Sequence, residues 1–141
     1  MKQCGKCKQS LELGSFGIDR RYNKPRSYCK KCACLREKEY RKRNPDKIRA
    51  SNIKQAYKVS LDEAYKLMSV SNCLICNVEL TKAKKSVRNK TDQVVDHCHE
   101  TGKVRGVLCS GCNLGLGHFN DDTSKLENAI KYINKTNKLW K

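Results

Sequence analysis

Four consecutive residues in the second half of the chain combine a carboxylate, two imidazoles and a thiol: Asp96, His97, Cys98 and His99. Histidine can accept a proton from water near neutral pH because its pKa lies in that range. Mg²⁺ prefers oxygen ligands and keeps several waters, so one carboxylate and one amide oxygen can hold it. Asp96 and Asn113 are the oxygen donors available near this stretch. These residue types suit phosphodiester hydrolysis, which needs a base for the water and a divalent cation on the phosphate.

The cysteines indicate a different kind of metal site. Eight of the ten form Cys-x-x-Cys pairs, at Cys4 and Cys7, Cys29 and Cys32, Cys73 and Cys76, and Cys109 and Cys112. In a reducing compartment such pairs are typical of metal sites rather than of disulfides. Two pairs complete one tetrahedral site, so we expect two structural zinc ions per chain. Residues 96–99 are then not needed for zinc, and a third zinc there is disfavoured because adjacent strand residues point to opposite faces.

The first two pairs are separated by 21 residues, a spacing that suits a zinc ribbon closed around a short hairpin. Gly14, Gly17 and residues 23–25 are turn signals between the pairs. Cys34 lies outside the pairs and could compete with its neighbouring pair as a ligand. Residues 1–34 are therefore predicted to form a zinc-ribbon-like module.

Residues 35–58 are expected to form a basic helical linker. Strong helix formers dominate this segment, and Pro45, after Asn44, fits the first turn of a second helix. Because Lys and Arg lie on every face, such a helix cannot bury much apolar surface. Two interpretations stay open, a solvated linker and an arm that orders on the DNA backbone.

Residues 59–141 are predicted to form a small α+β unit stabilised by zinc. The expected elements are a helix capped by Ser60 and Glu63, a strand at 93–98, a turn at Gly102, a strand at 104–109, a short helix after Cys112, and a helix from Thr123 or Ser124 with Leu126, Ala129, Ile130 and Ile133 on one face. Residues 81–92 are expected to be an exposed loop. Cys98 is expected to be a small buried residue of the first strand.

The chain is strongly basic, with a formal net charge of +17. Residues 1–58 carry 18 Lys and Arg against 5 Asp and Glu, whereas residues 59–141 carry 13 against 9. Two Cys₄–Zn²⁺ sites would leave a total of about +13. A solvated surface is one explanation for this excess. The other, which we favour, is a polyanionic partner, most often nucleic acid.

Membrane partners are disfavoured. No stretch approaches the roughly 18 apolar residues of a membrane span, and the first residues, MKQCGKCKQS, lack the apolar region of a signal peptide. No basic amphipathic helix has a strong apolar face either. We therefore expect a cytoplasmic protein.

The stretch DHCHETGKVRGVLCSGCNLGLGHF, residues 96–119, resembles the phage recombination endonuclease VII family of His-Me finger (ββα-metal) nucleases. YKVSLDEAYKLMSVSNCLICN is similar to the family's helix and first zinc knuckle, and LGHFNDDTSKLENAIKYI to its later helix. The resemblance covers about residues 57–134. Residues 1–34 are similar, more loosely, to zinc ribbons attached to phage nucleases. The resemblance implies a ββα-metal nuclease core with flanking helices, acting in the host cytoplasm if the protein is phage-encoded.

The resemblance also implies roles for single residues. His97 would be the general base, and Asp96 and Asn113 would hold Mg²⁺ or Mn²⁺. His99 would support the site or contact phosphate. The family's structural zinc would be bound here by Cys73, Cys76, Cys109 and Cys112.

Two departures from the family's pattern affect these expectations. Relatives that cut branched DNA can carry an active-site glutamate three residues after the Asn, where this chain has Leu116. His118 lies nearby and could help in place of the glutamate, but we favour its interpretation as a surface residue. Junction resolution in the family relies on a helical dimer, and little more than one helix follows Asn113. A homodimer is therefore an option that the sequence does not assure.

Two functions remain as hypotheses. The first is a metal-dependent DNA endonuclease, with branched DNA such as a Holliday junction, a specific duplex site or nonspecific nicking as candidate substrates. The second is a non-catalytic, zinc-containing protein that binds nucleic acid. Asp96, His97 and Asn113 favour the first, because a pure binder has no need of them. In an ideal strand, however, Asp96 and His97 face opposite sides, so the strand must twist or end there for both to serve one phosphate.

Overall fold

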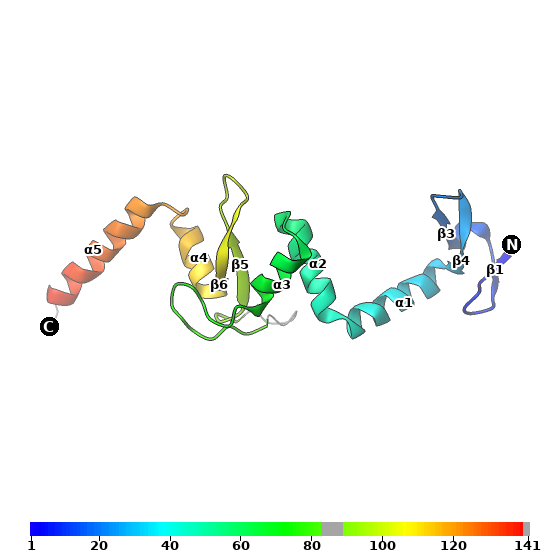
Figure 1. The fold of residues 1–141 in the computed structure, drawn as a ribbon, viewed down its shortest axis with the longest axis horizontal. Helices are drawn as coiled ribbons and strands as arrows, with labels where there is room; N and C mark the ends of the chain where they lie inside the picture. The colour runs from blue at the N-terminus through cyan, green and yellow to red at the C-terminus, as the bar shows by residue number, and fades with distance from the viewer. Residues whose placement is uncertain (83–88, 140–141) are drawn as a thin grey trace. The chain divides into compact units, whose positions relative to one another are not determined.

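The computed structural model describes residues 1–82 and 89–139, with side chains through residue 135. The elements are β1 (Lys2–Gln3), β2 (Ser10–Leu11), η1 (Leu13–Ser15), β3 (Phe16–Asp19), β4 (Lys24–Cys29), α1 (Lys30–Arg43), α2 (Pro45–Tyr57), α3 (Leu61–Ser69), β5 (Gln93–His97), β6 (Val104–Cys109), α4 (Ser110–His118) and α5 (Thr123–Leu139) (Figure 1). The predicted small α+β fold is confirmed. By their contacts the residues form two compact units, residues 1–49 and 50–141.

The first unit contains two small hairpins and helix α1. β1 pairs antiparallel with β2, and β3 pairs antiparallel with β4. Asn23 has a left-handed φ of 48° just before β4, as a turn residue should. Gly14 lies in η1, but Gly17 lies inside β3, so its interpretation as a turn signal was wrong. Phe16 is buried against the cysteines Cys4, Cys29 and Cys32, and this cluster is the unit's small core.

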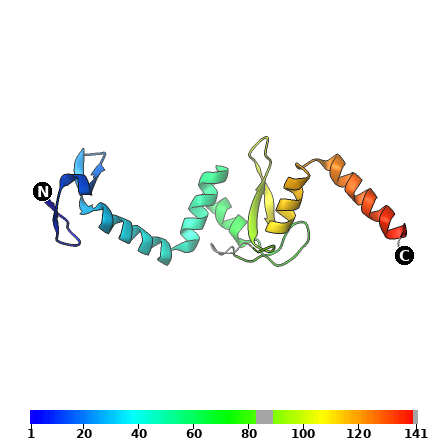
Figure 2. The ribbon, with the colours of Figure 1, turned by 180° about the vertical axis from the view of Figure 1, so that it is seen from behind.

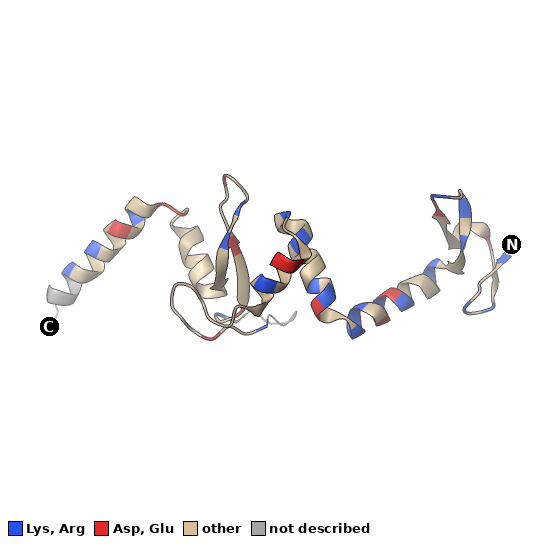
Figure 3. Cartoon of the chain, in the orientation of Figure 1, with Lys and Arg blue, Asp and Glu red and all other residues tan. Residues whose placement is uncertain are grey.

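Helices α1 and α2 meet at the predicted break. α1 ends at Arg43, and the side-chain amide of Asn44 donates to the carbonyl of Tyr40 in the last turn of the helix. Pro45 is the first residue of α2. Lys and Arg recur along α1 (Figure 3), as expected of a basic helix. α1 begins at Lys30, so it already contains the second cysteine of the preceding pair.

The second unit begins at Ala50, inside α2 and before the boundary predicted at residue 59. Ala50 and Ile53 are buried, and they pack with Ala64 of α3 and the partly buried Val95 of β5. The expectation that the basic segment buries little was therefore wrong for the second half of α2. Two well-placed apolar side chains in a polar sequence are enough to attach a helix to a core.

The second unit has the predicted strand, turn, strand and helix. β5 and β6 form an antiparallel hairpin whose turn contains Gly102 with a left-handed φ of 69°. Helix α4 follows β6 directly, and both views show it alongside the hairpin (Figures 1 and 2). The predicted capping box is confirmed, because Ser60 accepts from the Glu63 backbone and Glu63 accepts from the Ser60 backbone. The side chains thus fix where α3 begins.

One side chain connects the hairpin to α3. The amide nitrogen of Gln93, at the start of β5, donates to the carbonyl of Val70 at 2.7 Å. It also lies 3.3 and 3.4 Å from the carbonyls of Leu67 and Met68. These carbonyls belong to the C-terminal end of α3, where helical partners are missing. Gln93 therefore places the first strand of the hairpin against the end of that helix.

Helix α5 begins where predicted but has a different cap. The side chain of Asp122 accepts from the backbone N–H of Lys125, so Asp122 rather than Thr123 or Ser124 is the capping residue. Ile130 and Ile133 on its apolar face are 59% and 54% exposed, so this face contributes little to the core of its own unit. Within the loop expected at 81–92, residues 83–88 lie outside the described residues. The expected exposure was wrong at its last residue, because Asp92 is buried and accepts hydrogen bonds from the Thr81 hydroxyl and the Asn89 N–H. No helix of the described ranges is long and apolar enough to cross a membrane.

Candidate active site and metal centres

The paired cysteines gather into two clusters. Cys4, Cys7, Cys29 and Cys32 form one, and Cys73, Cys76, Cys109 and Cys112 form the other. Within each cluster all four sulfur atoms lie within 4.8 Å of one another. A tetrahedral site with Zn–S bonds of about 2.3 Å requires sulfur atoms about 3.8 Å apart. Cys76 Sγ and Cys109 Sγ lie 3.7 Å apart, so the sulfur atoms of this cluster are spaced as a zinc ion requires.

The second half of each cluster has the same local construction. Cys29 ends β4 and caps α1, accepting from the N–H of Cys32. Cys109 ends β6 and caps α4, accepting from the N–H of Cys112. In both clusters, therefore, the cysteine that ends a strand also caps the following helix with its sulfur. In the second unit this construction fixes the first turn of α4, where Asn113 follows Cys112.

The first half of each cluster is a knuckle that turns back on itself. The N–H of Lys8 donates to the carbonyl of Cys4, and the N–H of Asn77 donates to that of Cys73, both at 2.9 Å. Lys8 and Asn77 both have left-handed φ values, 59° and 56°. Because the two knuckles share this conformation, both sites present two sulfurs to the opposing strand and helix in the same way.

The thiols of each cluster differ in acidity because backbone hydrogen bonds and burial act on them unequally. The N–H of Cys29 and of Cys7 lower the pKa of Cys4 to about 6. Burial alone would raise the pKa of Cys73, but the N–H groups of Cys76 and Cys109 lower it to about 6. Burial raises the pKa of Cys32 to about 12. Such a mixture of thiolate and thiol is the state that a dication would convert to four thiolates.

The two remaining cysteines lie outside both clusters. Cys34 is exposed on α1. Cys98 is partly exposed and follows the end of β5, so the expectation of a buried strand residue was wrong. Its backbone instead shapes the turn, accepting from the N–H of Gly102 and donating to the carbonyl of Lys103. Hydrogen bonds from Thr101 lower the pKa of its thiol.

The hairpin is irregular at the residues that carry the candidate chemistry. Asp96 pairs with Gly106, whereas His97 pairs with Val104, so Arg105 is an extra residue on β6. β5 ends at His97. A bulge bends its strand and changes the directions of nearby side chains. At this point, therefore, β6 carries the bulge and the opposite strand, β5, ends.

His97 lies between two aromatic rings. Its ring stacks on that of His99, with centroids 5.0 Å apart, so these two histidines share a face as expected. The ring of Tyr57, from α2, meets it edge-on at 5.2 Å. The hydroxyl of Tyr57 donates to the carbonyl of Val95 at 3.1 Å. Burial and the charge of Asp96 raise the pKa of Tyr57, which keeps this hydroxyl protonated. The rings limit the orientations open to His97.

We expect Tyr57→Ala to slow any reaction that uses His97 by about tenfold, because a poorly oriented base reacts more slowly. Tyr57→Phe keeps the ring and loses only the hydrogen bond to Val95. This variant should lose about 1 kcal/mol of stability in urea unfolding while keeping nearly the wild-type rate. Wild-type cleavage by Tyr57→Ala would show that the ring contact does not orient His97.

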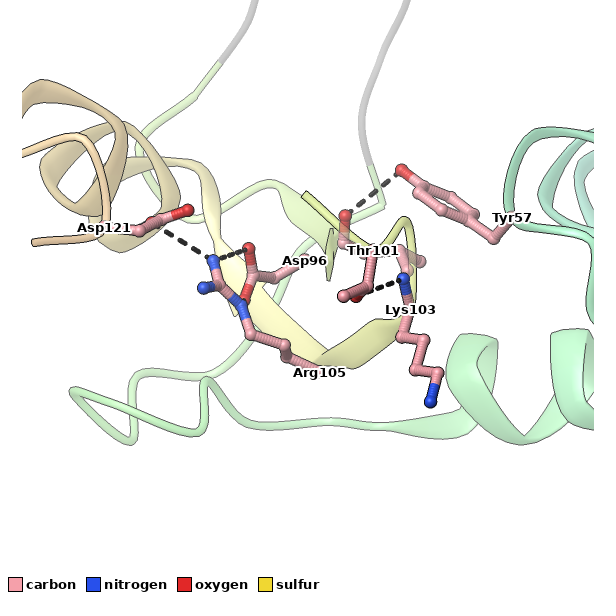
Figure 4. Close-up of polar contacts among 7 residues, drawn as sticks. Tyr57, Asp96, Thr101, Lys103, Arg105 and Asp121 are labelled. Atoms are coloured by element: carbon pink, nitrogen blue, oxygen red, sulfur yellow. Dashed lines mark hydrogen bonds and ion pairs between the residues drawn. The ribbon is translucent and has the colours of Figure 1, made fainter. Parts of the chain in front are cut away.

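Asp96 is buried and paired with a cation from the opposite strand. Arg105 donates from Nε to Asp96 Oδ2 at 2.7 Å and from Nη2 to Asp96 Oδ1 at 2.9 Å. The same Nη2 lies 3.1 Å from Asp121 Oδ1, in the loop after α4. Figure 4 shows the guanidinium between the two carboxylates. Hydrogen bonds to Asp96 and then to Asp121 raise the pKa of Arg105, so it is a permanent cation.

A cavity of about 210 Å³ lies beside this group, lined by His99, Gly117, Asn120 and Asp121. Its lining combines the turn after β5 with the end of α4 and the loop that follows α4. Leu116, where relatives can carry a glutamate, packs instead against the core formed by Cys73, Leu108 and Cys109. His118, as expected, is an exposed residue, at the last position of α4.

Sequence reasoning missed Tyr57, Arg105 and Asp121. Tyr57 lies 38 residues from Val95, whose carbonyl it contacts, and nothing local connects the two. An ideal strand would place Arg105 and Asp96 on opposite faces, because Arg105 adjoins the partner of Asp96. The sequence contained one signal for Asp121. Asp121 and Asp122 both precede the last helix, whereas a helix cap needs only one acidic residue.

A basic, aromatic hollow of about 390 Å³ lies on the first unit. Its lining includes Lys24, Arg26 and Arg36, with Tyr22 and Tyr28. The guanidinium of Arg36 lies 5.4 Å from the centre of the Tyr28 ring. Positive side chains beside aromatic rings suit a nucleic-acid strand, whose phosphates and bases they contact respectively.

Comparisons with known proteins identify the family of the chain. The sequence pattern of recombination endonuclease VII matches residues 50–135. The Gene 59 protein of Mycobacterium phage D29 is 30% identical over 133 residues, or 92% of this chain and 73% of the relative. The Gene 59 protein of Mycobacterium phage L5 is 31% identical over 131 residues, or 90% and 72%.

Among solved structures, the ββα-Me type II restriction endonuclease Hpy99I is similar, with 26% identity and a TM-score of 0.40. That similarity covers 96% of this chain but 65% of the restriction enzyme, so the chain spans less than two thirds of its length. The match to recombination endonuclease VII, in contrast, includes the whole hairpin, helix α4 and the second cysteine cluster. Because it extends over more than half of the sequence, the chain belongs to the recombination endonuclease VII family of metal-dependent DNA endonucleases.

Proposed function

We propose that the chain hydrolyses DNA phosphodiester bonds, with His97 as the general base and Asp96 and Asn113 as ligands of Mg²⁺ or Mn²⁺. The observation that carries this proposal is the bulged end of the hairpin. There the half-buried His97 and the buried Asp96 are successive residues where β5 stops. Because β5 ends there and the opposite strand carries the bulge, both side chains could serve one phosphate.

His97 would take the proton from the attacking water. Its ring is held between Tyr57 and His99, so its orientation is fixed before substrate arrives. A bound cation would stabilise the negative charge that develops on the phosphate and the leaving oxygen. The exposed His99, stacked on His97 at the rim of the small cavity, would contact a phosphate oxygen.

The donor groups suit a hard dication. Asp96 supplies a carboxylate, and Asn113, on the first turn of α4, supplies an amide oxygen. Arg105 donates one hydrogen bond to each oxygen of Asp96, but each carboxylate oxygen has a second lone pair. Asp96 can therefore hold a cation while it remains paired with Arg105.

The two cysteine clusters would each hold a structural zinc ion. One fixes the first turn of α4, and hence Asn113, and the other closes the small core of the first unit. The first unit and its basic hollow would hold the DNA backbone. Since its relatives are phage proteins, the protein would act in the cytoplasm of an infected bacterium.

One observation favours a second candidate function, a zinc-containing protein that binds nucleic acid without cutting it. Arg105 donates a hydrogen bond to each of the two oxygens of Asp96, as in a purely structural ion pair. Supercoiled plasmid incubated with the protein and Mg²⁺ separates the two functions. We expect relaxed circles with Mg²⁺ and none after addition of EDTA, because the cation is essential to the reaction. Intact plasmid that is nevertheless retarded on a gel would establish the binder.

A nuclease of this kind could act on branched DNA or on linear duplex. We propose branched DNA, cut by a homodimer, as one candidate and single-strand nicking of duplex by a monomer as the other. Comparison of a four-way junction with linear duplex, at one stated salt concentration, decides between them, because phosphate contacts alone make binding strongly salt-dependent. Sedimentation of the protein with each DNA shows whether cutting requires two copies.

A further inference from the structure

One guanidinium is shared by two carboxylates at the edge of the proposed metal site. Nη2 of Arg105 lies 2.9 Å from Asp96 Oδ1 and 3.1 Å from Asp121 Oδ1. The side chains of Asp96 and Asp121 are 10% and 20% exposed, and that of Arg105 is 38% exposed (Figure 4). These charges are partly shielded from water, so they act on one another and on a nearby ion more strongly than surface charges do.

The charge of this group depends on Asp121. Asp96 and Arg105 alone form a neutral pair, which attracts a dication weakly. Asp121 adds a second negative charge, so the three side chains together carry a net charge of −1. The group therefore keeps a negative potential beside Asp96 although Asp96 is ion-paired.

Within the described residues, the ion pair with Arg105 is the polar contact of the Asp121 side chain. The neighbouring Asp122 caps α5 and pairs with Lys125. Asn120 and Asp121 both have a left-handed φ of 55°, a conformation that non-glycine residues adopt at a cost. This backbone places the Asp121 carboxylate both against Arg105 and in the wall of the cavity that His99 also lines.

We propose that Arg105 and Asp121 are positioning residues that set the orientation of Asp96 and the cation affinity at this carboxylate. Arg105 fixes the carboxylate of Asp96 through two parallel hydrogen bonds, an arrangement that holds its plane. Asp121 offsets the charge of the guanidinium, so that the fixed carboxylate still attracts a dication. This inference rests on the proposed function, in which Asp96 is a metal ligand.

The test is Mn²⁺ binding to the zinc-loaded protein without DNA, measured from the loss of the free-ion signal in electron paramagnetic resonance. We expect Asp121→Asn to weaken binding by about tenfold, because the group becomes neutral. Arg105→Gln should bind Mn²⁺ more tightly than wild type, and the double variant should return close to wild type. At saturating Mn²⁺, Arg105→Gln should nevertheless cut plasmid more slowly, because Asp96 is no longer held.

Asp122→Asn is the matched control. It removes the same charge from the next residue, keeps a good capping side chain, and should bind Mn²⁺ as wild type does. Unchanged affinity in Asp121→Asn, or weaker affinity in Arg105→Gln, overturns the inference. Asp96→Asn separates this failure from that of the proposed function: if it binds Mn²⁺ like wild type, Asp96 is not a ligand and both fall together. Circular dichroism of each variant verifies that it is folded.

Discussion

Replacing His97 by alanine is expected to lower the rate of plasmid cleavage by roughly 10² to 10⁴, the usual contribution of a general base. The variant should still bind DNA, because the Lys and Arg residues that would contact phosphate are unchanged. His97 is half-buried at the end of β5, so the substitution removes a ring from the hairpin edge and not from the core. The measurement is single-turnover conversion of supercoiled plasmid to relaxed circles at saturating Mg²⁺.

His118→Ala is the matched control for this prediction. His118 is exposed at the end of α4 and lines none of the cavities found in the described residues near the hairpin. The control should cut at the wild-type rate, and both variants should retain two zinc ions. If His97→Ala cuts as fast as His118→Ala, His97 is not the base, and another group activates the water.

Local patterns in the sequence predicted most of the second unit. The strands at residues 93–97 and 104–109, the turn at Gly102 and the capping box at Ser60 depend on neighbours within a few residues. Alternation, a left-handed glycine and a reciprocal hydrogen bond each act over that range. The cysteine clusters were also predictable, since a tetrahedral site specifies the number and type of its ligands.

The surroundings of the candidate site depend on contacts that no local pattern contains. The bulge makes Arg105 an extra residue on β6, and strand alternation predicts the opposite face for its side chain. Tyr57 reaches His97 only because Ala50 and Ile53 attach α2 to the core, and they lie in a segment that is otherwise polar and basic. The roles of single residues at the candidate site therefore remain predictions, although the fold and family are shown.

In both cysteine clusters, one of the proposed zinc ligands also determines where a helix begins. In each, a strand ends on a cysteine whose sulfur also caps the following helix. Loss of that cysteine removes a metal ligand and a helix cap in one step. In the second unit the helix is α4, which carries Asn113, so the effect extends from the proposed zinc site to the proposed site of hydrolysis.

Cys109→Ala is therefore expected to unfold the second unit. Structural zinc contributes an apparent 10–16 kcal/mol in small zinc modules, about the whole stability of a typical domain. We expect one zinc ion instead of two by metal analysis, with loss of helical circular dichroism and of all cleavage. The exposed Cys34, outside both clusters, is the control, and Cys34→Ala should keep two zinc ions and full activity. A folded Cys109→Ala protein that retains both ions would show that the second cluster does not hold zinc.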